Sequence, residues 1–277
     1  MTNSIIGRPT LTSTVRMANN AFEQLRTHPS AWVVPLFSRK ANSVDQLEGS
    51  AWFVATADKP QAVTAAHVMR QIDKDRHVLL AVPTGRSAGL GRGEMTSIPV
   101  TAWFCHDTLD VAWLKAPLPS SVQSLAIMDC ELMFEWDVMC YDYSPGHPIR
   151  QSDGSLSFFA DAWAHKGNVV RGYREHDVHL MNTSFPLMQG ASGSPIMIKV
   201  ENEWYAAGMA IANLEQEFAP SILAQTVSVT ERDGTSETIK YFLPYGIALS
   251  SEELIRGIRK FFEPELFTPT VEVLAHL

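Results

Sequence analysis

Three short stretches of the chain contain residue types that could together carry out acyl transfer. His67 lies in VTAAHVM, Asp110 stands immediately before the apolar run VAWL, and Ser192 is followed by a glycine in QGASGSP. A serine nucleophile needs a base to take its proton, an acid to orient that base, and N–H donors where the oxyanion forms. The three residues therefore predict a hydrolytic site, provided that the fold brings them together.

Ser192 has a simpler interpretation when its motif is taken alone. Gly-x-Ser-Gly is expected by chance in roughly a tenth of chains of this length, and a serine among glycines suits a tight turn. The order His67, Asp110, Ser192 is one of the known orders of triad residues, and each residue lies at a predicted strand boundary. This coincidence favours the catalytic interpretation over the turn.

Two further clusters of polar residues offer alternatives. Asp107 is a second candidate for the orienting acid, but its position between His106 and Thr108 indicates a turn or an exposed loop. The stretch HDVH at 176–179 could hold a metal ion. Because no further Cys or His accompanies it at ligand spacing, an exposed strand end is the favoured interpretation, and we expect no metal.

Composition restricts the class of protein. The chain has 277 residues and a formal net charge of -8, without a basic run, so we expect no nucleic-acid partner. No apolar stretch approaches the roughly 20 residues that span a bilayer, so we expect no membrane partner. The amino terminus lacks the pattern of a secretory signal, and the three cysteines (Cys105, Cys130 and Cys140) show no disulfide-rich spacing. Both features predict a cytoplasmic protein.

The distribution of apolar residues predicts an all-β fold. Six short β-branched and aromatic runs lie between residues 31 and 116, and a second set follows the connector APLPSS. This pattern predicts two packed antiparallel six-stranded β-barrels, with a large sandwich as the alternative. An amphipathic pattern at 14–26 predicts a short N-terminal helix, and the capped stretch SEELIRGIRKFF, ending at Phe262, predicts a C-terminal helix.

These patterns divide the chain into four expected parts. Residues 1–30 form an N-terminal helical extension, and residues 31–117 form a first barrel that carries His67 and Asp110. Residues 118–249 form a second barrel that carries Ser192, and residues 250–277 form the C-terminal helix and tail. The predicted site therefore needs contributions from both barrels.

The blocks TAAH, DVAWLK and GASGSP resemble the three signature blocks of the trypsin/chymotrypsin-like serine peptidases. GSAWFV at 49–54 is similar to the strand before the histidine block in their bacterial high-temperature-requirement branch. The resemblance implies a chymotrypsin-like double barrel with the site in the cleft between the barrels, and neither a metal nor an organic cofactor. It implies that Ser192 is the nucleophile, that His67 transfers the proton and that Asp110 holds the imidazole. We expect no PDZ module, which that branch often carries.

The same resemblance implies an oxyanion hole formed by the N–H groups of Gly190 and Ser192, for which a residue without Cβ is suited at 190. It also implies two walls of a substrate pocket. One wall consists of Pro186, Leu187, Met188 and Gln189, and the other of Ala210, Ile211, Ala212 and Asn213. Pro186 stands where trypsin-like enzymes place an acidic pocket base, and the second wall begins with small or apolar residues. We therefore expect an uncharged side chain before the scissile bond.

One departure from the family concerns activation. Ala191 stands where many members carry an aspartate that pairs with a new amino terminus after zymogen cleavage. That mode of activation is excluded, so we expect either constant competence or control by a regulatory protein partner or by the N-terminal helix. The sequence thus predicts a cofactor-independent serine endopeptidase that acts on protein or peptide substrates.

Two other functions are alternatives to the peptidase. A catalytically silent member of the same fold could bind peptides in the cleft, although such a module has no need of all three triad residues. An α/β-hydrolase esterase needs Gly-x-Ser-x-Gly and an acid and histidine after the serine. Here position 194 is serine and both His67 and Asp110 precede Ser192, so the esterase is disfavoured.

Overall fold

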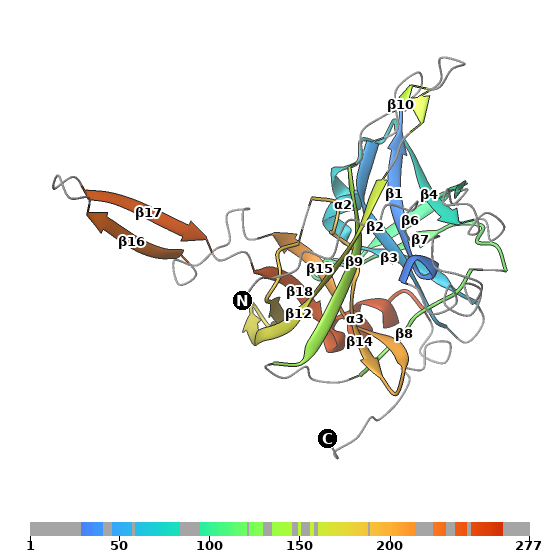
Figure 1. Cartoon of the computed structure of the whole chain (residues 1–277). Helices are drawn as coiled ribbons and strands as arrows, with labels where there is room; N and C mark the ends of the chain where they lie inside the picture. The colour runs from blue at the N-terminus through green and yellow to red at the C-terminus, as the bar shows by residue number, and fades with distance from the viewer. Residues whose placement is uncertain are drawn as a thin grey trace, which may run out of the picture.

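The protein is an all-β chain in which two large antiparallel sheets lie side by side (Figure 1). The computed structural model describes residues 29–40, 46–56, 59–83, 95–120, 122–129, 135–145, 149–150, 156–157, 160–187, 189–213, 224–230, 236–242 and 245–262. The helix predicted at 14–26 lies outside these residues. The predicted all-β class is confirmed.

The first sheet carries His67 and Asp110 on its connections and has seven strands. They are β1 (Val33–Arg39), β2 (Gln46–Val54), β3 (Gln61–Thr64), β4 (His77–Pro83), β5 (Met95–Pro99), β6 (Ala102–Cys105) and β7 (Ala112–Lys115), in the order β5-β4-β1-β2-β3-β7-β6. The sheet curls into a half-barrel, and among the described residues no ladder joins β5 to β6. The prediction of a closed six-stranded first barrel is therefore wrong.

The extra strand arises where the chain changes its hydrogen-bonding partner. The apolar run at 97–105 reads as one strand in the sequence. In the structure the amide of Val100 donates to the carbonyl of Val78, whereas the next amide, of Thr101, donates to the carbonyl of Lys115. The run is therefore divided between the two edges of the sheet. The periodicity of apolar residues does not predict such a change of hydrogen-bonding partner.

The second sheet closes into a six-stranded antiparallel barrel, as predicted. It consists of β9 (Asp137–Pro145), β12 (Ala160–Glu175), β13 (Val178–Thr183), β14 (Pro195–Val200), β15 (Glu203–Asn213) and β18 (Gly246–Ser250), and pairing of β14 with β15 completes the ring. The short β8 (Ala126–Ile127) adds to β15 in parallel. Two small sheets, β10 (Ile149–Arg150) with β11 (Leu156–Ser157) and β16 (Ala224–Thr230) with β17 (Ser236–Phe242), were not predicted.

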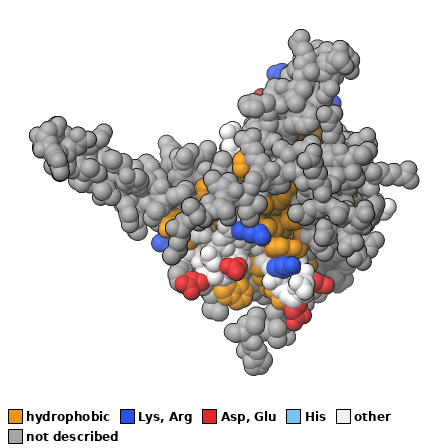
Figure 2. Space-filling model, in the orientation of Figure 1, with side chains coloured by type: hydrophobic (Ala, Val, Ile, Leu, Met, Phe, Trp, Pro, Cys, Tyr) orange, Lys and Arg blue, Asp and Glu red, His pale blue; other side chains and the backbone are white. Residues whose placement is uncertain are grey.

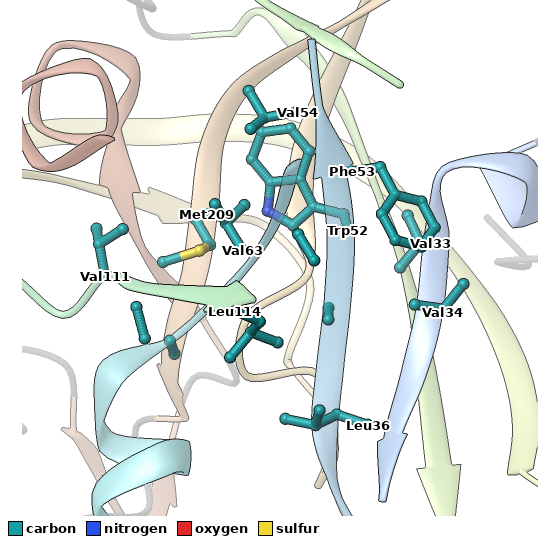
Figure 3. Close-up of a cluster of buried hydrophobic side chains, with 14 of the residues drawn as sticks. Val33, Val34, Leu36, Trp52, Phe53, Val54, Val63, Val111, Leu114 and Met209 are labelled. Atoms are coloured by element: carbon teal, nitrogen blue, oxygen red, sulfur yellow. The ribbon is translucent and has the colours of Figure 1, made fainter. Parts of the chain in front are cut away.

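Apolar side chains from both sheets share one core, which holds the two halves of the site together. Trp52 on β2 is fully buried, and Figure 3 shows Met209 of β15 beside Val63 of β3 within the same cluster. Burying a side chain of this size contributes about 1.5–3 kcal/mol. The backbone also joins the halves, because the amide of Leu125 donates to the carbonyl of Phe53 on the first sheet.

The described chain has two α-helices and one 3-10 turn, η2 (Pro29–Ala31). The short α2 (Ala66–Gln71) follows β3, and α3 (Ser251–Arg259) closes the chain on the second barrel. The Ser250 hydroxyl accepts the amide of Glu253, so the predicted cap is confirmed, although the helix ends at Arg259 rather than at Phe262.

In the lower middle of Figure 2, described acidic and basic side chains lie close to one another, with hydrophobic side chains between them. None of the described helices has the length and apolar character that a membrane span requires.

Candidate active site

His67 is held by the short helix α2 rather than by a strand. The run PQAVTAAHV is one of the six runs in the first half of the chain that predict strands, but β3 ends at Thr64 and the helix begins at Ala66. Alanine favours helix, and the helix buries Ala66, Val68 and Met69 against the core. His67, the second residue of α2, keeps its side chain 31% exposed. The buried face of the helix thus fixes the backbone of His67, while its imidazole stays half-buried.

Asp110 makes two hydrogen bonds to His67, one to the backbone and one to the ring. The amide of His67 donates to Oδ1 of Asp110 at 2.7 Å, and Nδ1 of His67 lies 2.6 Å from Oδ2. An ionised carboxylate can only accept, so Nδ1 carries the proton and Nε2 is left as an acceptor. The predicted pairing of these two residues, 43 positions apart, is thus present in the structure.

The turn before Asp110 is organised by His106, to which the sequence analysis assigned no role. His106 is buried, and its Nδ1 lies 3.2 Å from the amide of Thr108 and 3.1 Å from the amide of Leu109. Its backbone carbonyl accepts from the Arg70 guanidinium of α2 at 2.6 Å. The imidazole therefore acts as a local cap, as Asx side chains do in turns. No sequence signal distinguishes this histidine from an ordinary turn residue.

Protonation of His106 is expected to open this turn. Burial lowers the pKa of His106 below its ordinary value of 6.5, because desolvation disfavours the imidazolium. The stabilisation is complete above pH 6.5 and is lost as the pH falls through the lowered pKa. We expect the difference in unfolding midpoint between the parent and His106→Ala to shrink as the solution is acidified.

The matched control for this titration is His106→Asn, whose side-chain oxygen can accept the same two amides without titrating. It should stay close to the parent at neutral pH and exceed it in acid. Denaturant unfolding across the pH range measures both variants, and a His106→Ala difference that is independent of pH would contradict the role of the neutral imidazole.

The loop that carries Ser192 is docked onto the first sheet by backbone contacts. The carbonyl of Ser192 accepts the amide of Ser50 at 3.0 Å. Gly193 has φ of 89°, and a Cβ there would lie 2.3 Å from the hydroxyl of Thr64 and 2.9 Å from the amide of Ala65, just before α2. The loop thus reaches the start of the helix that holds His67. In the described part of the chain no hydrogen bond joins the Ser192 hydroxyl to His67.

Some backbone amides around Ser192 donate hydrogen bonds to described residues, and others do not. Those of Gly193 and Ser194 donate to the carbonyls of Ala210 and Ala191. Those of Gly190 and Ser192 donate to none of the residues that the structure describes. These two are the donors that the sequence predicts for an oxyanion hole, and an unused pair of N–H groups can bind a developing negative charge.

Ser50 supports Gly190 from β2 and is a second residue that sequence reasoning missed. Its hydroxyl accepts the amide of Tyr143 at 3.2 Å and donates to the carbonyl of Gly190 at 2.8 Å. One side chain therefore links the first sheet, β9 of the barrel and the loop of Ser192. The sequence contains GSAWFV at this place, but nothing in the motif assigns a partner to the serine.

The residues predicted as pocket walls differ in their exposure. Leu187 and Ala210 are buried with Ala191 in the core of the closed barrel, so their side chains contribute to its packing. Pro186 and Ile211 are half-buried and Gln189 is exposed. Met188 and the side chains of Ala212 and Asn213 lie outside what the structure describes, and the backbone of the last two continues β15.

The other polar candidates have partners elsewhere. Asp107 is exposed and pairs with Lys260, which lowers the pKa of Asp107, so it does not face His67. His176 and Asp177 form the β12–β13 turn with positive φ, and His179 lies 2.7 Å from Glu252. No cluster of metal ligands occurs among the described residues. Burial raises the pKa of Cys105 and, more strongly, of Cys140; Cys130 lies outside the described part.

Comparison of the sequence with protein-family models and with curated proteins gives no match.

Proposed function

We propose that the chain is a serine endopeptidase with a chymotrypsin-like double-barrel fold. The observation that carries the proposal is the pair of hydrogen bonds between Asp110 and His67, at 2.7 Å and 2.6 Å, beside a loop whose Gly190 and Ser192 amides have no described partner. A base fixed in one tautomer and two free donors are the parts that acyl transfer to serine needs. His67 and Asp110 lie on connections of the first sheet, and the loop of Ser192 belongs to the second barrel.

In the proposed reaction the Ser192 hydroxyl attacks the carbonyl carbon of the scissile bond, and its proton passes to Nε2 of His67. Asp110 stabilises the resulting imidazolium, and the Gly190 and Ser192 amides bind the oxyanion. His67 then gives the proton to the leaving nitrogen as the C–N bond breaks. Water attacks the acyl-enzyme, His67 takes its proton, and the carboxylic acid product leaves as the proton returns to Ser192.

The substrate we propose is a protein or peptide with an uncharged side chain before the scissile bond. Pro186 and Ile211 are the half-buried wall residues, and neither can pair with a charge. Since Ala191 carries no carboxylate, activation by a new amino terminus does not apply, and control by a regulatory protein partner is the form of regulation that we propose.

Labelling with a fluorophosphonate probe tests the proposed nucleophile, because the probe reacts only with an activated serine. We expect the parent protein to be labelled with a stoichiometry near one, and Ser192→Ala to take up no label. Ser194→Ala is the matched control, since Ser194 lies two positions away and its amide, rather than its side chain, holds the loop. It should label like the parent.

The second candidate function is a catalytically silent peptide-binding protein of the same fold. It is favoured by one observation, that in the described residues the Ser192 hydroxyl makes no hydrogen bond to His67. If the folded parent takes up no label under conditions in which a reference serine peptidase is labelled, the peptidase proposal fails and the binding function becomes the better one.

A further inference from the structure

A buried aspartate and a histidine lie side by side in the closed barrel and have no part in the triad. Asp142 on β9 is fully buried, and Nε2 of His165 on β12 lies 3.2 Å from its Oδ2. Neither Nε2 of His165 nor Oδ1 of Asp142 is aligned with a hydrogen-bond partner in the described structure. A buried carboxylate with incomplete hydrogen bonding costs free energy, so the barrel is expected to retain it for a reason other than stability.

The pair contacts the first residue of the loop that ends at Ser192. The ring of His165 is stacked on that of Phe185, with centroids 5.8 Å apart and planes 20° apart, and it is also stacked with the ring of Trp163, with centroids 6.4 Å apart. The carbonyl of Phe185 accepts the amide of Gly246 and the hydroxyl of Thr183, both at 2.9 Å. Phe185 is therefore fixed by its backbone to the barrel and by its ring to His165.

The neighbour of Asp142 contacts the other end of the same loop. Tyr143 donates its amide to Ser50, and its carbonyl would lie 2.2 Å from a Cβ on Gly190. Gly190 has φ of 95° and fits against this carbonyl because it lacks a side chain. A displacement of His165 would therefore move Phe185, and a displacement of β9 at Asp142 would move Tyr143 and so Gly190.

We propose that Asp142 and His165 are positioning residues that hold Phe185 and residues 189–192 in the conformation in which the amides of Gly190 and Ser192 have no partner among the described residues. The inference rests on the proposed function in treating these amides as the oxyanion donors. Residues 185–192 include no charged side chain that could anchor the loop by an ion pair, and Ala191 is buried among apolar side chains. The side chains act on the reaction through Phe185 and Tyr143 rather than by touching substrate.

This role predicts an unusual effect of a substitution on stability. Burial raises the pKa of Asp142, so ionisation is disfavoured in the folded protein relative to the unfolded chain. The stability linked to Asp142 is complete in acid and is lost as the pH rises through the raised pKa. Above the raised pKa the buried carboxylate lowers the stability of the folded protein, and Asp142→Asn removes this cost. If Asp142 served only the packing of the core, its replacement would instead lower the unfolding midpoint.

Amide hydrogen exchange of the full chain, followed by mass spectrometry at neutral pH, tests the proposal. In Asp142→Asn and in His165→Gln we expect the amides of Gly193, Ser194 and Gly246, which donate to the carbonyls of Ala210, Ala191 and Phe185, to exchange at least tenfold faster than in the parent, while the rest of the barrel is unchanged. The unfolding midpoint of Asp142→Asn should equal or exceed that of the parent. The control is His179→Gln, which removes an exposed histidine–carboxylate pair between β13 and α3 of the same barrel.

Two outcomes overturn the proposal: unchanged exchange of the amides of Gly193, Ser194 and Gly246 in both variants, or faster exchange of the whole barrel together with a lower midpoint or failure to fold. Exchange needs no catalytic turnover, so the result is separate from the labelling of Ser192. A loosened loop in a protein that takes up no label would support the positioning pair and reject the peptidase. A labelled parent with an unchanged loop would do the reverse.

Discussion

Asp110→Asn is expected to lower the rate of fluorophosphonate labelling about 10,000-fold while the fold is retained. The side-chain oxygen of asparagine can keep the bond from the His67 amide, which is 2.7 Å long with Asp110. Its NH₂ group then faces Nδ1 of His67, which must become an acceptor. The ring proton moves to Nε2, and the imidazole loses the lone pair that would accept the proton of Ser192.

The control for this prediction is Asp107→Asn, which separates the two candidate acids of the sequence. Asp107 is 79% exposed and pairs with Lys260, so its replacement should leave the labelling rate within about twofold of the parent. Circular dichroism and the unfolding midpoint show whether both variants are folded. A labelling rate of Asp110→Asn within tenfold of the parent would contradict the assignment of Asp110.

The all-β class and the closed second barrel could be predicted from the sequence, because alternating apolar runs report which residues face a core. The open first sheet could not be predicted. Its extra strand depends on the change of partner between Val100 and Thr101, which is a long-range hydrogen-bonding choice. The hairpin of β16 and β17 was missed although TVSVT in β16 alternates valine with polar residues, which is the pattern of a half-buried strand.

The motifs of the sequence predicted the residues of the candidate site, but they did not predict the residues that hold the site in place. His67 and Asp110 are paired as predicted, since their blocks combine the chemistry with a distinctive local sequence. Ser50, His106 and His165 were missed. Each acts through a partner that is remote in sequence or through an unusual use of a side chain, such as an imidazole that accepts two backbone amides. A single sequence carries no signal for such contacts.

Gly193→Ala is expected to lower the free energy of unfolding by about 3 kcal/mol or more and to abolish labelling of Ser192. The residue has φ of 89°, which L side chains rarely adopt. A Cβ would also lie 2.2 Å from the carbonyl of Ser50 and 2.3 Å from the hydroxyl of Thr64, inside their contact distance. These two groups form a buried hydrogen bond of 2.7 Å, which the methyl group would break or displace.

Gly172→Ala is the control because the chemical change is the same and the surroundings differ. A Cβ at Gly172, on β12, meets only the carbonyl of Leu180 at 3.9 Å, and the backbone has no positive φ. Alanine restricts the unfolded chain there, so stability should be unchanged or rise by about 0.4–1 kcal/mol. Denaturant unfolding compares the two variants. If Gly193→Ala lies within 1 kcal/mol of Gly172→Ala, the loop of Ser192 is not packed against Ser50 and Thr64, and the junction that joins the nucleophile to the helix of His67 must be different.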